Sequence, residues 1–208
     1  NIGYNREGRG FLLDFSPEIN YHKHYINRYA FLFNEYIGNK YVYLPELSLR
    51  HTGQKTFQFD NSHKTIALYL GGENKEFRKY PDEYAVQLLR LLNRQGYNLL
   101  LIGDENDNIK HTQYAEEARI DHLINLTART TIEGFINTIA NVDLIITIDS
   151  SALHIAAAVK TPFIALMGLS TSPTSTILPK VPLGRILKIE NNLIREEDYI
   201  RNITPDLI

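Results

Sequence analysis

From Lys64 onward, short apolar runs alternate with segments whose apolar residues recur at helical spacing. The runs have the length of buried strands, and they are TIALYL (65–70), NLLLIG (98–103), HLINL (122–126), DLIITI (143–148), PFIALMG (162–168) and RILKIE (185–190). Helical segments follow four of these runs. The first begins at Pro81, and the other three cover 109–118, 130–142 and 152–159. Strands that alternate with helices indicate βαβ units. The pattern predicts an α/β fold with a doubly wound parallel sheet.

The chain before Lys64 follows different patterns. Aromatic and aliphatic residues from Tyr21 to Ile37 recur at helical spacing, and Gly38 supplies a C-terminal stop. Residues 39–64 have no sustained periodicity and several breakers, so they predict a linker laid over a surface. The opening NIGYNREGRGFLLDF, which starts with Asn1, indicates a start within a domain. We expect a fragment, with a trimmed but otherwise complete chain as the alternative.

Composition limits the partners and the compartment. The 208 residues are 43% hydrophobic and carry a net charge of −2, which gives no general reason to bind nucleic acid. The absence of cysteine excludes disulfides and thiolate metal sites and fits a reducing compartment. The apolar runs fall short of the ~20 residues that span a bilayer. We expect a soluble, cytoplasmic protein.

The first candidate site follows the strand at 143–148, because ligands of such sheets bind where strands lead into helices. Asp149, Ser150 and Ser151 form the turn before an apolar helix, whose first amides favour phosphate. Alternatively, Ser150 or Ser151 caps the helix and Asp149 binds nearby amides. His154, inside this helix, is either a core histidine or a residue that faces the ligand.

The second candidate is the loop GGENKEFRKYP after the first strand. Gly71 and Gly72 allow close approach of a ligand, and Lys75, Arg78 and Lys79 gather positive charge there. Phosphate binding is one interpretation and a solvated basic loop is the other. The loop matches neither the G-x-x-x-x-G-K-[ST] nor the G-x-G-x-x-G pattern.

The third candidate is GDENDN, where Asp104, Glu105 or Asp107 could bind a ribose or could simply begin a helix. Thr130 and Glu133 have the spacing of a capping box. No supported metal-ligand spacing occurs. Ser150 and Ser151 also lack the G-x-S-x-G context of a hydrolase nucleophile.

Together, GG…RKYP, LLLIGDEND, NLTARTTIE and DLIITIDSSALHIAAAVKTPFIALMG resemble the donor-binding, C-terminal half of family 9 glycosyltransferases, the bacterial ADP-heptose:lipopolysaccharide heptosyltransferases. Asp149 and His154 keep the family's spacing. Ser150 and Ser151 replace its Thr and Gly, and Leu169 stands where Pro is usual. Arg78 takes the place of a phosphate-binding lysine. Glu73 and Asn74 replace small hydroxyl residues, and a carboxylate there would repel a diphosphate.

The resemblance implies a GT-B architecture with two Rossmann-like domains. We then expect residues 1–38 to be a remnant of the acceptor domain, 39–64 the linker, 65–190 the Rossmann-like nucleotide-sugar-binding domain and 191–208 a terminal helix. The family transfers the sugar with inversion at the anomeric carbon, uses no metal or other cofactor, and takes its carboxylate base from the first domain. We therefore expect this chain, by itself, to bind nucleotide sugar weakly or not at all and to be inactive.

The resemblance also assigns roles. Arg78 and helix amides would neutralise the leaving diphosphate, and Asp149 would hold sugar hydroxyls or order the loop. One of the acids would bind the ribose, and the backbone around Arg129 and Thr130 would flank the base. The full donor-binding set is Gly72, Asn74, Arg78, Lys79, Asp107, Arg129, Thr130, Asp149, Ser150, Ser151 and His154.

The function expected from the resemblance is transfer of heptose, or a related sugar, from a nucleotide sugar to a lipopolysaccharide core or another glycan. This would take place in the cytoplasm, with peripheral contact at the inner face of the inner membrane. One alternative keeps the fold but uses a UDP-sugar or epimerises it. Another is a non-catalytic nucleotide-binding or interaction module, which self-associates or binds another chain through the Tyr21–Tyr36 helix.

Overall fold

A computed structural model describes residues 1–6, 8–19, 25–41, 48–60, 62–71, 78–168, 178–179, 181–189 and 195–208. The chain divides into two compact units. The first is Asn1–Leu47 with Thr171–Pro179, and the second is Ser48–Ser170 with Lys180–Ile208. The boundary between Leu47 and Ser48 falls inside the range for which the sequence predicts a linker.

The first unit contains a 3-10 helix, η1 (Arg9–Leu12), and the helix α1 (Tyr25–Tyr36). The Tyr4 hydroxyl donates to the Arg28 carbonyl at 2.6 Å, and the ring of Phe15 meets that of Tyr36 edge-on at 5.5 Å. Gly38 has the positive φ (83°) that a C-terminal stop requires. Of the helix predicted for 21–37, residues 21–24 lie outside the described residues.

The second unit is built on a parallel sheet, which confirms the predicted fold class. Within the described residues the sheet has six strands in the order β3-β2-β1-β4-β5-β6, and neighbouring strands all pair in parallel. The strands are β1 (Thr65–Tyr69), β2 (Asn98–Leu101), β3 (Leu123–Asn125), β4 (Leu144–Ile148), β5 (Phe163–Leu166) and β6 (Gly184–Leu187).

The strand order contains one reversal of direction. The chain runs outward from β1 through β2 to β3 and then returns to place β4 on the other side of β1, where Ala67 pairs with Ile145. In open α/β sheets, ligands bind outside the carboxyl ends of strands at such a switch point. The topology therefore points to the crevice between the ends of β1 and β4.

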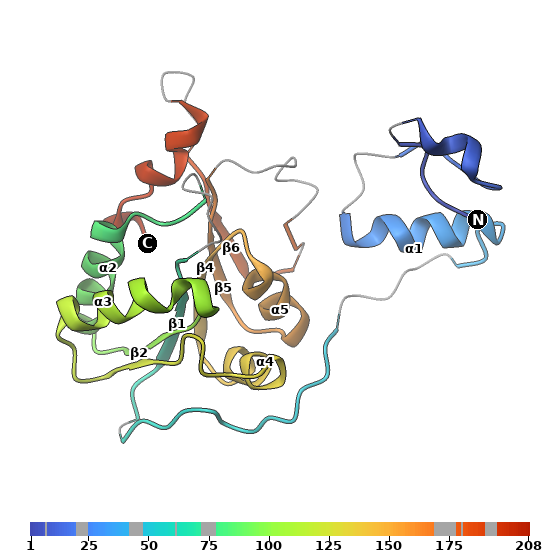
Figure 1. Ribbon diagram of the computed structural model, residues 1–208. Helices are drawn as coiled ribbons and strands as arrows, with labels where there is room; N and C mark the ends of the chain where they lie inside the picture. The colour runs from blue at the N-terminus through green and yellow to red at the C-terminus, as the bar shows by residue number, and fades with distance from the viewer. Residues whose placement is uncertain are drawn as a thin grey trace. The chain divides into compact units, whose positions relative to one another are not determined.

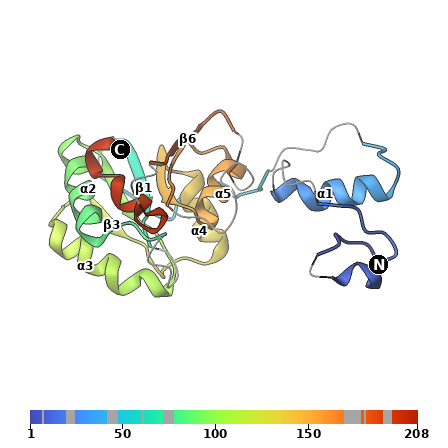
Figure 2. The same cartoon turned by 90° about the horizontal axis from the view of Figure 1, so that it is seen from above.

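Helices cover both faces of the sheet. Figures 1 and 2 show α2 (Asp82–Arg94) and α3 (Asn108–Ala118) on one side, and α4 (Ile132–Ala140) and α5 (Ser151–Val159) on the other. The core lies between these layers, where Leu68, Leu100 and Ile145 are fully buried. Each such side chain contributes about 1.5–3 kcal/mol by leaving water. No helix among the described residues is both long enough and apolar enough to cross a bilayer.

Residues 48–60, which we name the strap, lie along α4. The Thr52 amide donates to Asn137 Oδ1 at 3.1 Å, and Asn137 Nδ2 donates back to Thr52 Oγ1 at 2.9 Å. The hydroxyls of Thr56 and Thr138 lie 2.6 Å apart. Asn137 and Thr138 are 3% and 0% exposed. These polar residues of α4 are therefore buried beneath the strap instead of facing solvent.

The C-terminal segment packs beside α2. It forms the 3-10 helices η3 (Glu196–Asn202) and η4 (Pro205–Leu207) where the sequence predicts one terminal helix. Thr204 is extended because it precedes a proline, and this interrupts the helix after Asn202. Ile200 and Ile203 are buried, and the Tyr80 hydroxyl donates to the Ile203 carbonyl at 2.9 Å.

Candidate functional site

Arg78 and Asp149 meet at the switch point. Arg78 follows β1 and Asp149 follows β4, and Arg78 Nη2 lies 4.0 Å from Asp149 Oδ2. Their side chains are 20% and 16% exposed, so the pair is partly shielded from solvent. The structure thus brings together two residues that the sequence places 71 positions apart.

The first turn of α5 begins beside this pair. Ser150 occupies the N-cap position, but among the described residues its hydroxyl makes no bond to the helix amides. Its Oγ instead lies 2.9 Å from Thr147 Oγ1. The expectation that Ser150 caps the helix through its side chain is therefore wrong, because the strand residue Thr147 takes that hydroxyl. Ser151 is exposed as the first helical residue, and His154 is partly exposed further along the same helix.

Asp107 fills the space between the ends of β1 and β2. Its side chain packs so closely on Gly71 that a Cβ there would lie 1.8 Å from Asp107 Oδ1. The carboxylate is 6% exposed, and Oδ2 accepts the Asp104 amide at 3.3 Å in a capping box. Asp104 and Glu105 are exposed at the same strand end. Two predicted candidates of the glycine loop, Gly72 and Asn74, lie outside the described residues.

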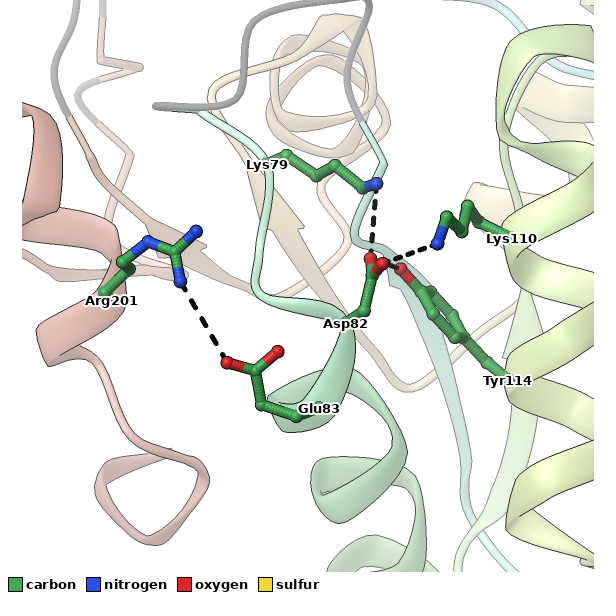
Figure 3. Close-up of polar contacts among 6 residues, drawn as sticks. All are labelled: Lys79, Asp82, Glu83, Lys110, Tyr114 and Arg201. Atoms are coloured by element: carbon green, nitrogen blue, oxygen red, sulfur yellow. Dashed lines mark hydrogen bonds and ion pairs between the residues drawn. The ribbon is translucent and has the colours of Figure 1, made fainter.

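Lys79 points to a different partner from its neighbour Arg78. Figure 3 shows Lys79, Lys110 and Tyr114 converging on Asp82, the first residue of α2. Lys79 Nζ lies 3.2 Å from Asp82 Oδ1 and Lys110 Nζ lies 2.7 Å from Oδ2, while the Tyr114 hydroxyl also donates to Oδ1. We name these four residues the Asp82 cluster.

Charge and hydrogen bonding in the Asp82 cluster fix its protonation. Partial burial would raise the pKa of Asp82, but hydrogen bonds from Lys110, Tyr114 and Lys79 outweigh it and lower the pKa to about 2. Burial, with the nearby Asp82 charge, raises the pKa of Tyr114. Asp82 is thus ionised near neutral pH while Tyr114 keeps its hydroxyl proton, and the cluster ties the entry of α2 to α3. The sequence reasoning missed it, although the i, i+3 spacing of Lys79 and Asp82 was a usable signal.

The connection from β3 to α4 carries the residues predicted to flank a base. Arg129 is exposed and Thr130 partly exposed. The predicted capping box of Thr130 and Glu133 is wrong by one residue, because Thr131 is the N-cap and its Oγ1 accepts the Gly134 amide at 3.1 Å. Thr131 has the extended backbone that lets its side chain fold back on the first turn.

A buried histidine contacts the connection from β3 to α4. His111 of α3 is fully buried, and its Nδ1 lies 2.7 Å from Thr127 Oγ1. Burial lowers the pKa of His111 to about 4, and the charge of Lys79 acts in the same direction. His111 is therefore neutral near pH 7. In the part of the chain that the structure describes, no group of three or more His, Asp or Glu side chains could hold a metal ion.

Residues 1–196 match the sequence model of glycosyltransferase family 9 (heptosyltransferase). The chain belongs to this family. Lipooligosaccharide heptosyltransferase 2 of Haemophilus influenzae is 32% identical over 154 residues, which cover 68% of this chain and 44% of that protein. The chain thus spans less than half the length of this family 9 relative.

Solved structures share the fold. Escherichia coli ADP-heptose lps heptosyltransferase II superposes with a TM-score of 0.75 at 22% identity, over 99% of this chain and 66% of that one. The family 9 glycosyl transferase from Veillonella parvula gives a TM-score of 0.78 at 16% identity, over 95% of this chain and 61% of that one. The fold of this chain is therefore that of family 9 enzymes.

Proposed function

We propose that this chain is the donor-binding part of a family 9 glycosyltransferase and that it binds the diphosphate of a nucleotide sugar between the carboxyl ends of β1 and β4. The observation that supports this best is the meeting of Arg78 and Asp149 at the switch point, 4.0 Å apart, beside the start of α5. A guanidinium can bind phosphate oxygens in pairs, and the first amides of a helix favour the same charge.

The role of the site in sugar transfer follows from the position at which negative charge develops during the reaction. When the sugar leaves its donor, negative charge grows on the leaving diphosphate, and groups already pointing at that position stabilise the transition state. We assign this role to Arg78 and the amides of the first turn of α5, with Ser150 and Ser151 beside them. Gly72 and Asn74, which lie outside the described residues, stay predictions from the sequence. The positive charge of the protein then serves where other enzymes use a metal.

The remaining parts of the donor are assigned by position at the same sheet edge. Asp149 would hold the sugar hydroxyls and orient Arg78. One of the acids after β2, Asp104, Glu105 or Asp107, would accept hydrogen bonds from the ribose, and the exposed position of Asp104 and Glu105 favours these two over the buried Asp107. Arg129 with Thr130 would flank the base. Lys79 and His154 would border this site, with Lys79 held by the Asp82 cluster.

The donor and acceptor are proposed from the relatives. One relative is named a lipooligosaccharide heptosyltransferase and one solved structure an ADP-heptose lps heptosyltransferase. We propose ADP-heptose, or a closely related nucleotide sugar, as the donor and a lipopolysaccharide core as the acceptor. Such an acceptor would place the enzyme in the bacterial cytoplasm at the inner face of the inner membrane.

Calorimetric titration of the chain with ADP-heptose, ADP and UDP tests the proposal. We expect ADP-heptose and ADP to bind at one site, weakly in the chain alone and more tightly when an acceptor domain is joined to it, and UDP to bind more weakly than either. Tighter binding of UDP would indicate a uridine-based nucleotide sugar as the donor. No binding of any of the three, even with the acceptor domain present, would contradict the assignment of the site.

A further inference from the structure

Three oxygen atoms form a chain of hydrogen bonds at the end of β4. Thr147 is fully buried, and its hydroxyl donates to the Ile148 carbonyl at 3.1 Å. Because a hydroxyl has one hydrogen, Thr147 Oγ1 must act as the acceptor toward Ser150 Oγ, 2.9 Å away. The Ser150 side chain is therefore turned toward the strand end, and its oxygen accepts no first-turn amide of α5.

The Ser150 backbone would otherwise suit capping. Its φ of −148° and ψ of 173° lie in the extended region that N-cap residues adopt. Thr131, at the start of α4, has a similarly extended backbone, and its side chain does accept an amide of the first turn. The two helix starts differ in where the N-cap hydroxyl bonds, and at Ser150 that choice goes with the neighbouring Thr147.

We propose that Thr147 is a positioning residue that holds the Ser150 hydroxyl away from the first-turn amides of α5, so that these amides stay available to the donor diphosphate. The inference rests on the proposed function, because it assumes that the diphosphate binds at this helix start. Thr147 itself is buried and would not touch the ligand.

The substitution Thr147→Val separates this role from a general structural one. Valine has nearly the shape of threonine but cannot accept the Ser150 hydroxyl, so Ser150 can turn and cap the helix. Capping stabilises a helix start and occupies amides that would otherwise bind the anion. Compared with the same change in a chain without the Ser150 hydroxyl, Thr147→Val should therefore stabilise the fold and weaken the affinity for the diphosphate. Loss of a purely structural hydrogen bond would lower both the stability of the fold and the affinity.

The experiment compares Thr147→Val in the wild-type and Ser150→Ala backgrounds, with ADP and inorganic pyrophosphate as calorimetric probes and thermal unfolding as the second readout. Thr161→Val is the matched control, because Thr161 is also buried and its hydroxyl donates to a carbonyl, that of Ile139, at 2.8 Å. We expect Thr147→Val to weaken ADP binding about fivefold when Ser150 is present, the factor that one ordinary hydrogen bond represents. We expect no weakening in the Ser150→Ala background.

The unfolding arm needs no ligand. Relative to its effect in the Ser150→Ala background, Thr147→Val should raise the unfolding temperature when Ser150 is present. Equal losses of affinity in both backgrounds, or a stability effect that does not depend on Ser150, would overturn the proposal. If the wild-type protein binds neither probe even with an acceptor domain joined to it, the proposed function fails, and the unfolding measurements still decide whether Thr147 directs the Ser150 hydroxyl.

Discussion

The starts of α4 and α5 invite comparison, because both helices follow a strand of the same sheet and cover the same face (Figure 1). At α4, Thr131 accepts an amide of the first turn, and the strap covers the later residues Asn137 and Thr138. At α5, Ser150 bonds to Thr147 instead, and the nearby charges are those of Arg78 and Asp149. A helix start whose polar groups are satisfied internally serves stability, whereas one with polar groups left accessible is suited to bind a ligand.

The first prediction concerns the start of α4 and has the largest expected effect. It is the pH dependence of the free energy of unfolding. His111 supports the loop before α4, and its folded pKa of about 4 lies below its unfolded value near 6.5. Below pH 6.5 the unfolded chain binds a proton that the folded chain does not, so stability falls as the pH decreases and the loss is complete below pH 4. The full loss is about 3 kcal/mol.

Urea unfolding between pH 7 and pH 5 would measure this dependence. His111→Asn keeps a polar atom near the position of Nδ1 and should flatten the dependence, while His122→Asn, at an exposed position, should leave it unchanged. A dependence that persists in His111→Asn would assign it to another group.

The variant Arg78→Ala tests whether the start of α5 binds a ligand. Removing a charged donor from a phosphate should weaken ADP binding by about 2 kcal/mol. The free energy of unfolding should change by less than about 0.5 kcal/mol, because a partly exposed ion pair at this distance contributes little. Calorimetry and urea unfolding supply the two measurements.

Arg201→Ala is the matched control for Arg78→Ala. Its ion pair with Glu83 is also 4.0 Å long but lies beside α2 (Figure 3). An equal loss of affinity in both variants would point to long-range charge instead of contact with the ligand.

The smallest expected effect compares the two N-caps directly. Thr131→Ala should lower the free energy of unfolding by about 1 kcal/mol, because it leaves the Gly134 amide without its acceptor. Ser150→Ala removes no cap and should change it by less than about 0.5 kcal/mol. Urea unfolding of both variants at pH 7 measures the difference, and equal losses would remove the distinction between the two helix starts.

The sequence predicted the parallel sheet because buried strands such as β1 and β4 are nearly continuous apolar runs, and apolar periodicity is a local signal. Taken by residue pattern, Arg78 and Asp149 were two separate candidates, and it was the resemblance to family 9 that predicted one site for both. What it could not supply was the direction of individual polar side chains. Lys79 and Arg78 are adjacent in the sequence, yet Lys79 binds Asp82 and Arg78 faces Asp149.

Hydroxyl residues at helix starts show the same limit. Thr130 and Thr131 are equally plausible caps by composition, and the choice depends on which residue takes the extended backbone. At Ser150 the decision depends on a neighbour in the preceding strand. The strap lies on α4 as a linker laid over a surface would, but its contacts use backbone groups and small polar side chains, so no hydrophobic period in the sequence shows which surface it covers.

The strap also determines the residue at which a recombinant form of the second unit should begin. A recombinant protein begun at Thr65, the first residue of the sheet, would leave Asn137 and Thr138 without the partners that bury them. A protein begun at Ser48 would keep those hydrogen bonds and the bond from the Leu49 amide to the Ala158 carbonyl. The shortest piece worth expressing for nucleotide titrations is therefore longer than the sheet and its helices.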